Sequence, residues 1–483
     1  MMPAIEPGRP PGIGPKVVES LDPNAAVYLT RPTEALHRPD RIPTPARRRI
    51  RRRASLNHYG PRPNRCDVAN SPIVLGDARR PVDVLAAAAR LRGHIVRTPL
   101  VRAPPLPGLG DAAVYLKLEN FQATGAFKIR GAINRIAQIP EDDARRGVAA
   151  ASAGNHAQGV AWAARERGIP ATIVMPETAS PLKITRTRSL GARVLLHGAN
   201  YDEAHEYALQ LAARERLTYV HPYDDPDVIS GQGTVGLEIL EDLPMVRRVI
   251  AGVGGGGLLS GIAAGLHAQG SSAEVIGIQS TGADTLRASL AAGKVVEGGT
   301  PNTFADGLAT RHIGQLPLEI LRAVHARAFV VDDRAIARAS FLLLELAKVL
   351  AEGAGAAATA GLLEHPELAR DGPVVVVVSG GNLDPFVLDH VLFIGLAAEG
   401  RLLRLRSAMR DVPGQLAAFL KVAADSGANV RHLNHERESP DLPPGRVTVE
   451  IELEVRDGAH GLEVERAYRD AHWPVERLSI HAP

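Results

Sequence analysis

Residues 117–134 read KLENFQATGAFKIRGAIN, and the rest of the chain is organised around the lysine in this stretch. Lys128 stands between Phe127 and Ile129, and no other charged residue occurs from position 120 to 129. Apolar surroundings disfavour the ammonium form of a lysine and lower its pKa. The pattern therefore predicts an amine that is partly free near neutral pH and can form a Schiff base. A lysine that snorkels at the start of an amphipathic helix is the alternative interpretation.

Three later segments place polar or small residues directly after an apolar run. SAGNHAQG (152–159) continues GVAAAS, GGGGL (254–258) follows RRVIAGV, and SGGN (379–382) follows PVVVVV. Together with the lysine segment they resemble the fold-type II pyridoxal-phosphate enzymes, the tryptophan synthase β-like group. Within that group the chain is most similar to the threonine ammonia-lyases, or threonine dehydratases. The resemblance runs from about Val82 to Gly400 and implies pyridoxal 5'-phosphate as the cofactor.

Composition excludes several other classes of protein. The 483 residues are 45% hydrophobic and 23% charged, which is typical of a soluble globular protein. The net charge of +3 comes largely from a local arginine cluster, so it does not indicate nucleic-acid binding. The single cysteine, Cys66, excludes an intramolecular disulfide and a cysteine-based metal site. No apolar run is long enough to span a bilayer, so we expect no membrane partner and a cytoplasmic location.

Residues 1–74 differ from the rest because they are rich in proline and arginine and lack apolar periodicity. Such a segment cannot bury enough apolar surface to offset its ordering entropy, so we expect a disordered extension. The run ARRRIRRRAS (46–55) could bind nucleic acid or a membrane surface, but a solvated tail is the preferred interpretation. Translation could also start later than Met1, at a non-methionine codon such as that of Val74.

Strand-like runs such as ATIVMP and EVIGIQ alternate with helical patterns from about residue 75 to 398. Continuous β-branched runs separated by helices are typical of parallel strands covered on both faces. The pattern predicts an α/β catalytic domain with doubly wound parallel sheets. The resemblance implies two subdomains with the cofactor between them, the smaller and mobile one at about residues 120–223.

Residues 401–483 follow a different plan, with an expected β-α-β-β-α-β order that is typical of a ferredoxin-like domain. This order resembles an ACT regulatory domain. The resemblance assigns the ligand-binding turn to residues 411–416, with Asp411, Pro413, Gly414 and Leu416 as regulatory residues. A small dimerisation module without a ligand is the alternative.

The turn Gly254-Gly255-Gly256-Gly257-Leu258 has no side chains to block a close approach to its first four residues. Its N–H groups can converge on a phosphate, and the helix that follows adds the positive end of its dipole. The turn lacks the GK[ST] ending of a nucleotide P-loop. We therefore expect it to bind the cofactor phosphate.

Ser379 is either a helix N-cap or, as the resemblance implies, the residue whose hydroxyl faces the pyridine nitrogen. A neutral hydroxyl holds a proton on that nitrogen less strongly than a carboxylate would. The ring is then a weaker electron sink, which favours elimination over transamination.

The resemblance assigns the remaining roles. Lys128 would carry the cofactor and remove the Cα proton of the substrate, and Asn155 would hydrogen-bond the ring hydroxyl. Phe127 and Gly307 would flank the ring, and Glu352 would lie near the substrate. The loop expected to hold the substrate carboxylate, at a helix N-terminus, consists of Ser152, Gly154, Asn155 and His156.

Three positions depart from related proteins. Ala153 replaces the second serine of serine racemases, so we expect weak racemisation. Gln279 and Thr285 replace two acidic residues that bind a divalent cation in some relatives, so we expect no metal site. Ala126 stands where the family usually has serine before Phe-Lys.

These features predict deamination of L-threonine to 2-oxobutanoate and of L-serine to pyruvate, in amino-acid catabolism or isoleucine biosynthesis. The alternatives within the fold are serine or 3-hydroxyaspartate ammonia-lyase and, less similar in the motifs TGAFKIRGA and SAGNHAQG, threonine synthase and cysteine synthase. A non-catalytic amino-acid sensor and an RNA-binding protein are the alternatives from other classes. The expected partners are an amino-acid substrate, isoleucine or valine as effector, and further copies of the chain in a homodimer or homotetramer.

Overall fold

The computed structural model describes residues 81–438 and 442–480. The N-terminal extension expected at residues 1–74, with its arginine run, lies outside the described residues.

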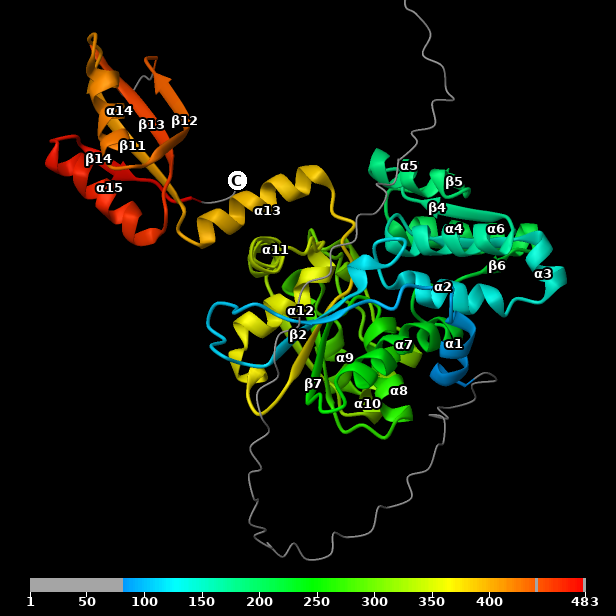
Figure 1. The fold of residues 1–483 in the computed structure, drawn as a ribbon. Coiled ribbons are helices and arrows are strands. Elements are labelled where there is room, and N and C mark those ends of the chain that lie inside the picture. The colour runs from blue at the N-terminus through cyan, green and yellow to red at the C-terminus, as the bar shows by residue number, and fades with distance from the viewer. Residues whose placement is uncertain (1–80, 439–441, 481–483) are drawn as a thin grey trace, which may run out of the picture. The chain divides into compact units, whose positions relative to one another are not determined.

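A six-stranded sheet forms the centre of the larger part, and its strands have the order β1-β2-β10-β7-β8-β9. Figure 1 labels two of these strands, β2 and β7. β1 pairs with β2 in the antiparallel sense, and all other neighbours are parallel. The sequence did not predict β1, because this three-residue strand has no buried position. The strand bounds are β1 Leu100–Arg102, β2 Val114–Leu118, β7 Arg248–Gly252, β8 Glu274–Ser280, β9 Arg327–Val331 and β10 Val374–Val378.

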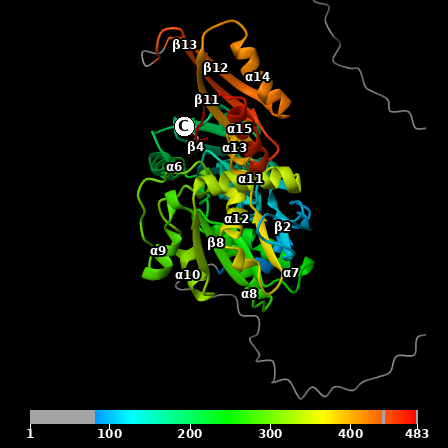
Figure 2. The same ribbon diagram turned by 90° about the vertical axis from the view of Figure 1, so that its left-hand side faces the viewer.

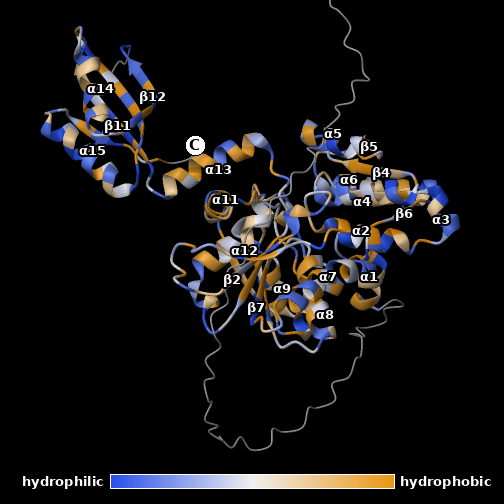
Figure 3. Ribbon diagram, in the orientation of Figure 1, coloured by the Kyte–Doolittle hydropathy of each residue, from blue (hydrophilic) through white to orange (hydrophobic). Residues whose placement is uncertain are grey.

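Strand β10 shows why this sheet has helices on both faces, since all of its five valines are buried. Val374, Val376 and Val378 belong to an apolar core shared with α11 (Asp333–Ala347) and α12 (Gly353–Glu364). Val375 and Val377 belong to a second core shared with α7 (Pro226–Asp242), α8 (Gly257–Ala268) and α10 (Gln315–Ala323). A strand buried on both faces has no polar alternation, and Figure 3 shows apolar residues gathered along the strands of this sheet.

The helices of the larger part are α1 Val84–Leu91, α7 Pro226–Asp242, α8 Gly257–Ala268, α9 Leu286–Ala292, α10 Gln315–Ala323, α11 Asp333–Ala347, α12 Gly353–Glu364 and α13 Pro385–Ala398. Short 3-10 turns occur at Glu119–Phe121, Thr281–Ala283, Asp306–Leu308 and Pro366–Ala369.

A second, four-stranded parallel sheet has the order β5-β4-β3-β6. Its core on one face is shared with α2 and α4, and on the other face with α6. Its elements are α2 Lys128–Ala137, α3 Glu141–Arg146, β3 Val148–Ala151, α4 Asn155–Arg167, β4 Ala171–Met175, α5 Pro181–Ser189, β5 Arg193–Leu196, α6 Tyr201–Glu215 and β6 Thr218–Tyr219.

Helices α2 and α7 cross at two glycines, Gly131 and Gly231. A Cβ atom on Gly131 would lie 2.5 Å from the side-chain nitrogen of Gln232, and one on Gly231 would lie 2.5 Å from the carbonyl oxygen of Arg130. The two backbones are therefore in direct contact, which fixes the helix that begins at Lys128 against α7.

A buried network of ion pairs also connects α2 with α7. The Arg130 guanidinium donates to both oxygens of Glu119, at 2.7 and 2.8 Å, and to both oxygens of Glu238, at 2.7 and 3.0 Å. Lys117 Nζ donates to Glu238 at 2.6 Å. Burial opposes ionisation of Glu119, but the charge of Arg130 prevails and the pKa of that carboxyl is lowered. The network ties α2 to the end of β2 and to α7.

The C-terminal part is the predicted ferredoxin-like domain, with an antiparallel sheet in the order β12-β13-β11-β14. Figure 2 labels β11, β12 and β13 of this sheet together with α14 and α15. Its two helices share one core with the sheet, in which the rings of Phe419 and Tyr468 lie 4.7 Å apart. Its elements are β11 Leu402–Arg410, α14 Gln415–Asp425, β12 Asn429–Glu436, β13 Arg446–Glu454, α15 Gly458–Asp470 and β14 Val475–Arg477.

Candidate active site

A cavity of about 460 Å³ lies where elements of the two parallel sheets meet. Every residue that the sequence predicted for cofactor or substrate lines it. These residues are Phe127, Lys128, Ser152, Gly154, Asn155, His156, Gly254, Gly255, Gly256, Gly257, Leu258, Gly307, Glu352 and Ser379.

Lys128 is the first residue of α2 and is partly buried in the wall of the cavity. Its Nζ donates to the carbonyl oxygen of Pro222 at 2.7 Å and lies 5.3 Å from the centre of the Phe127 ring. Loss of solvation lowers the pKa of Lys128 to about 8. The alternative interpretation of the sequence, a lysine that snorkels into solvent, does not describe this side chain.

Asn155, the first residue of α4, is held by two other cavity residues. Its Nδ2 donates to Glu352 Oε1, and its Oδ1 accepts from Asn382 Nδ2 at 2.7 Å. Burial raises the pKa of Glu352 to about 7. Asn382 was not predicted as a site residue, although it is the last residue of the SGGN motif. Its second hydrogen bond, to the carbonyl oxygen of Thr124 at 2.7 Å, connects the motif with the segment before Lys128.

The loop before α4 presents small residues to the cavity. Ser152 Oγ accepts a hydrogen bond from the Gly154 amide at 3.1 Å. His156 is buried, its Nε2 lies 2.9 Å from the carbonyl oxygen of Val220, and burial lowers its pKa to about 3. The imidazole is therefore neutral at physiological pH and adds no charge to the site.

The glycine turn joins β7 to α8, which begins at Gly257. Gly256 has φ +92°, in the left-handed region that favours glycine. A Cβ atom on Gly255 would lie 2.3 Å from the Tyr223 ring, so no side chain fits there. The first N–H groups of a helix have no partner within the helix, and those of α8 are available to an anion together with its dipole.

Ser379 directly follows β10 and is buried. Its hydroxyl donates to the carbonyl oxygen of Ala354, in α12, at 3.2 Å. The N-cap interpretation of this serine is wrong, because Asp384 caps the following helix, α13.

Several residues that line the cavity belong to none of the sequence motifs, and the sequence analysis did not predict them as site residues. Lys183 and Arg186 come from α5, Tyr201 from α6, and Asp306 from the 3-10 turn that also contains Gly307. Lys183 forms an ion pair with Asp306, which joins a helix beside the small sheet to a loop beside the large sheet.

Gln279 and Thr285, the positions of the cation ligands of some relatives, lie close together. The Gln279 side-chain oxygen accepts from the amides of Thr285 and Leu286 at 3.0 and 2.6 Å. This side chain therefore fixes the start of α9. In the part of the chain that the structure describes, no group of three or more His, Cys, Asp or Glu side chains is arranged to hold a metal.

The turn expected to bind an effector joins β11 to α14. Gly414, with φ +90°, is the N-cap of α14, and a Cβ atom there would meet nothing within 4 Å. Asp411 and Pro413 are exposed, and the Asp411 carboxylate pairs with Arg437 at 3.1 Å. Leu416 packs against the core of the domain.

The residues of the cavity fit pyridoxal phosphate. A primary amine with a lowered pKa suits a Schiff base, and a side-chain-free turn at a helix N-terminus suits a phosphate. The Asn155 amide and the Ser379 hydroxyl are hydrogen-bonding groups for a polar ring, and they lie in the same cavity.

Comparison with known proteins agrees with this geometry. The family described as "pyridoxal-phosphate dependent enzyme" matches residues 91–380. An L-threonine ammonia-lyase from Thermotoga maritima is 44% identical over 384 residues, covering 80% of this chain and 96% of that relative. The solved structure of threonine deaminase isoform 2 from Solanum lycopersicum has a TM-score of 0.61 and 34% identity, covering 65% of this chain and 86% of that chain. That of maize serine racemase has the same TM-score, 0.61, and 34% identity, covering 65% of this chain and 97% of that chain.

Fold and cavity together define an α/β enzyme with a cavity, suited to a phosphate-bearing cofactor, between two parallel sheets. The chain belongs to the pyridoxal-phosphate dependent enzyme family, and pyridoxal phosphate is its cofactor. Among residues 81–438 and 442–480, no helix combines the length and the apolar character needed to cross a membrane.

Proposed function

We propose that this enzyme deaminates L-threonine to 2-oxobutanoate and ammonia by elimination of water, and that it also converts L-serine to pyruvate. The observation that carries the proposal is the Lys128 amine, with its pKa lowered to about 8, in one cavity with the glycine turn. The names of the Thermotoga maritima and Solanum lycopersicum relatives support threonine as the substrate.

Each group of the cofactor has a proposed partner. Lys128 would hold the cofactor through its amine, and Gly254–Leu258 with the N-terminus of α8 would hold the phosphate. Asn155 would bond the ring hydroxyl, Ser379 would face the ring nitrogen, and Phe127 and Gly307 would flank the ring. When bound, pyridoxal phosphate supplies an electron sink for the electrons of the broken Cα–H bond.

The chain's own residues would bind the substrate and move its proton. The substrate carboxylate would lie at the N-terminus of α4, where Ser152, Gly154, Asn155 and His156 offer polar groups and a favourable dipole. Lys128, as a free amine, would remove the Cα proton. Because the pKa of Glu352 is raised to about 7, this carboxyl is partly neutral near pH 7 and does not fully repel a substrate anion.

The proposal includes the domain plan and regulation. Residues 75–398 would form the catalytic domain, with a small mobile subdomain at about 120–223, and residues 401–483 an ACT domain. Isoleucine or valine would bind at the turn formed by Asp411, Pro413, Gly414 and Leu416. We also propose that the protein forms a homodimer or homotetramer. The single cysteine supports a cytoplasmic location.

The test is an absorbance scan of the purified protein followed by a 2-oxo acid assay with L-threonine and L-serine. We expect a cofactor band in the visible or near-ultraviolet range and 2-oxo acid from both substrates. Lys128→Ala, as the control, should release no 2-oxo acid. A protein that holds the cofactor but releases no 2-oxo acid from either substrate would refute the proposal.

A further inference from the structure

Helix α5 presents two cationic side chains to the active-site cavity. Lys183 and Arg186 are three positions apart, so they share one face of the helix, and both line the cavity. Arg188 lies on the same helix but is exposed and does not line the cavity. The sequence of α5 contains no catalytic motif, so these charges are additional to the site already described.

The two cations differ in their partners. Lys183 is neutralised by its ion pair with Asp306. Arg186 is only partly exposed, and within residues 81–438 and 442–480 its guanidinium has neither an ion pair nor a hydrogen bond. Apart from the Lys128 amine, which would hold the cofactor, the described part of the cavity wall therefore carries one positive charge without a partner in the protein, that of Arg186. Withdrawing a charge from water without a partner is unfavourable, which points to a ligand that supplies the partner.

The side chains of threonine and serine cannot supply it, because they are neutral. Their α-carboxylate already has a proposed place at the N-terminus of α4. Arginine is suited to a planar carboxylate, which it can bind through two parallel hydrogen bonds.

We propose that Arg186 recognises a carboxylate on the β-carbon of the substrate, so that the enzyme also accepts 3-hydroxy amino acids with an acidic side chain. This inference rests on the proposed elimination of water. The Cα–H and Cβ–O bonds break and water leaves, and water is taken up again when the released enamine hydrolyses. 3-Hydroxyaspartate then gives oxaloacetate and ammonia, and no oxidant or reductant is needed.

The test compares kcat/KM for L-3-hydroxyaspartate with that for L-threonine. In Arg186→Gln the ratio of the two should fall roughly 10- to 100-fold, the range expected for a hydrogen bond between charged groups. Arg186→Lys should recover part of the ratio. Arg188→Gln, the matched control on the exposed face of α5, should leave the ratio unchanged.

A binding measurement adds a readout that does not depend on turnover. L-Aspartate and L-2-aminobutyrate differ only in a carboxylate in place of a methyl group, and neither has a β-hydroxyl to lose. Calorimetry should show that Arg186→Gln weakens the binding of aspartate by a similar factor relative to that of aminobutyrate.

Three results would overturn the inference. Equal losses of kcat/KM on both substrates would place Arg186 at the α-carboxylate. A loss of cofactor on dialysis, followed by absorbance, would place it at the cofactor phosphate. Turnover of threonine but not of hydroxyaspartate by the unmodified enzyme would refute the inference alone, whereas turnover of neither would refute the proposed function.

Discussion

Lys128 loses solvation in the cavity wall, and this has a consequence for stability that can be measured without substrate. Its pKa falls from 10.5 to about 8, so between these values the unfolded chain binds more protons than the folded one. Stability of the cofactor-free protein should therefore rise with pH from 8 to 10.5. At pH 7, Lys128→Met should stabilise the cofactor-free protein by about 1 to 3 kcal/mol. This range is smaller than the full pKa shift implies, because solvent in the cavity screens the charge.

Chemical denaturation at pH 7 and pH 10.5 measures this effect. The gain from Lys128→Met should shrink at the higher pH, because the unfolded lysine then also loses its proton. Lys183→Met, the same substitution at a lysine paired with Asp306, should bring no such gain. A Lys128 variant whose gain is independent of pH would contradict the lowered pKa.

The identity of the cofactor lysine is a separate prediction at the residue scale. Borohydride reduction of the loaded enzyme, followed by peptide mapping, should place the pyridoxyl group on Lys128. Lys117 is unsuitable because its ammonium is bound to Glu238 in the buried network, and Lys183 is paired with Asp306. Label on either of these two lysines would exclude the assignment.

Ala153 gives the prediction about stereochemistry. It lines the cavity beside Gly154 and offers no hydroxyl for protonation of Cα from a second face. L-Serine should therefore yield pyruvate with little D-serine, as chiral chromatography would show. Ala153→Ser should raise the D-serine share, whereas similar amounts of the two products from the unmodified enzyme would contradict the argument.

The predicted residues of the cavity lie in short segments at the beginning or end of a strand or helix. Among the missed residues, Arg186 and Tyr201 reach the cavity from segments with no comparable pattern, whereas Asn382 belongs to the SGGN motif and is identified only by its contacts. Asn382, for example, meets Asn155 across 227 positions of the chain. Contacts of this kind depend on the packing of distant elements, so residue type and local spacing did not reveal them.

At the scale of elements, the attachment of α2 to α7 should contribute strongly to stability. Removing one partner of a buried ion network leaves the others unpaired, at a cost of roughly 3 to 5 kcal/mol. Arg130→Met should therefore lower the free energy of unfolding by about that amount, as denaturant titration would measure.

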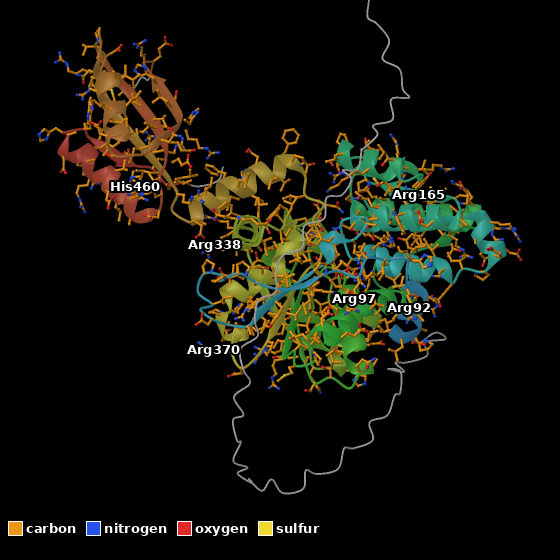
Figure 4. All side chains as sticks on the ribbon, in the orientation of Figure 1. Arg92, Arg97, Arg165, Arg338, Arg370 and His460 are labelled. Carbon is orange, nitrogen blue, oxygen red and sulfur yellow. The ribbon has the colours of Figure 1, made fainter. Side chains whose placement is uncertain are left out.

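The matched control is Arg97→Met, at an arginine labelled in Figure 4. The side chain of Arg97 is 53% exposed. Arg97 pairs with Glu241 and Asp242 at the surface, and such pairs contribute about 0 to 1 kcal/mol. Equal losses in the free energy of unfolding for the two substitutions would show that the buried network stabilises the protein no more than a surface ion pair.

Inner strands such as β3, β4, β8 and β10 were predictable because burial on both faces leaves continuous apolar runs. The antiparallel edge strand β1 was not, since its side chains are not buried and only the pairing with β2 defines it. The C-terminal domain was predictable from the strict alternation in β13, where buried and half-buried positions alternate.

At the scale of the whole molecule, the C-terminal domain should make turnover sensitive to isoleucine or valine. An effector changes activity only by binding two conformations differently, and typical coupling changes apparent affinity about 5- to 150-fold. Substrate saturation curves with and without isoleucine should differ for the full-length protein and coincide for one that ends near Gly400. A truncated protein that responds equally would place the effector site elsewhere.

Gly414→Asp tests the turn itself, because it adds a carboxylate where a ligand carboxylate would approach. Gly427→Asp is the matched control, since Gly427 also has a positive φ, +72°, and open space around it. Both substitutions carry backbone strain, but only the first should abolish the response to isoleucine.

The strand order of the large sheet also constrains how the protein is made. Leu116 pairs with Val376, so the ribosome adds the partner strand roughly 260 residues after β2, a delay on the order of 10 to 50 s at usual elongation rates. During that interval β2 has an apolar face and an open edge without its partner. The nascent chain should therefore depend on chaperones until β10 emerges, whereas the C-terminal domain, whose strands are close in sequence, can form as soon as it leaves the exit tunnel.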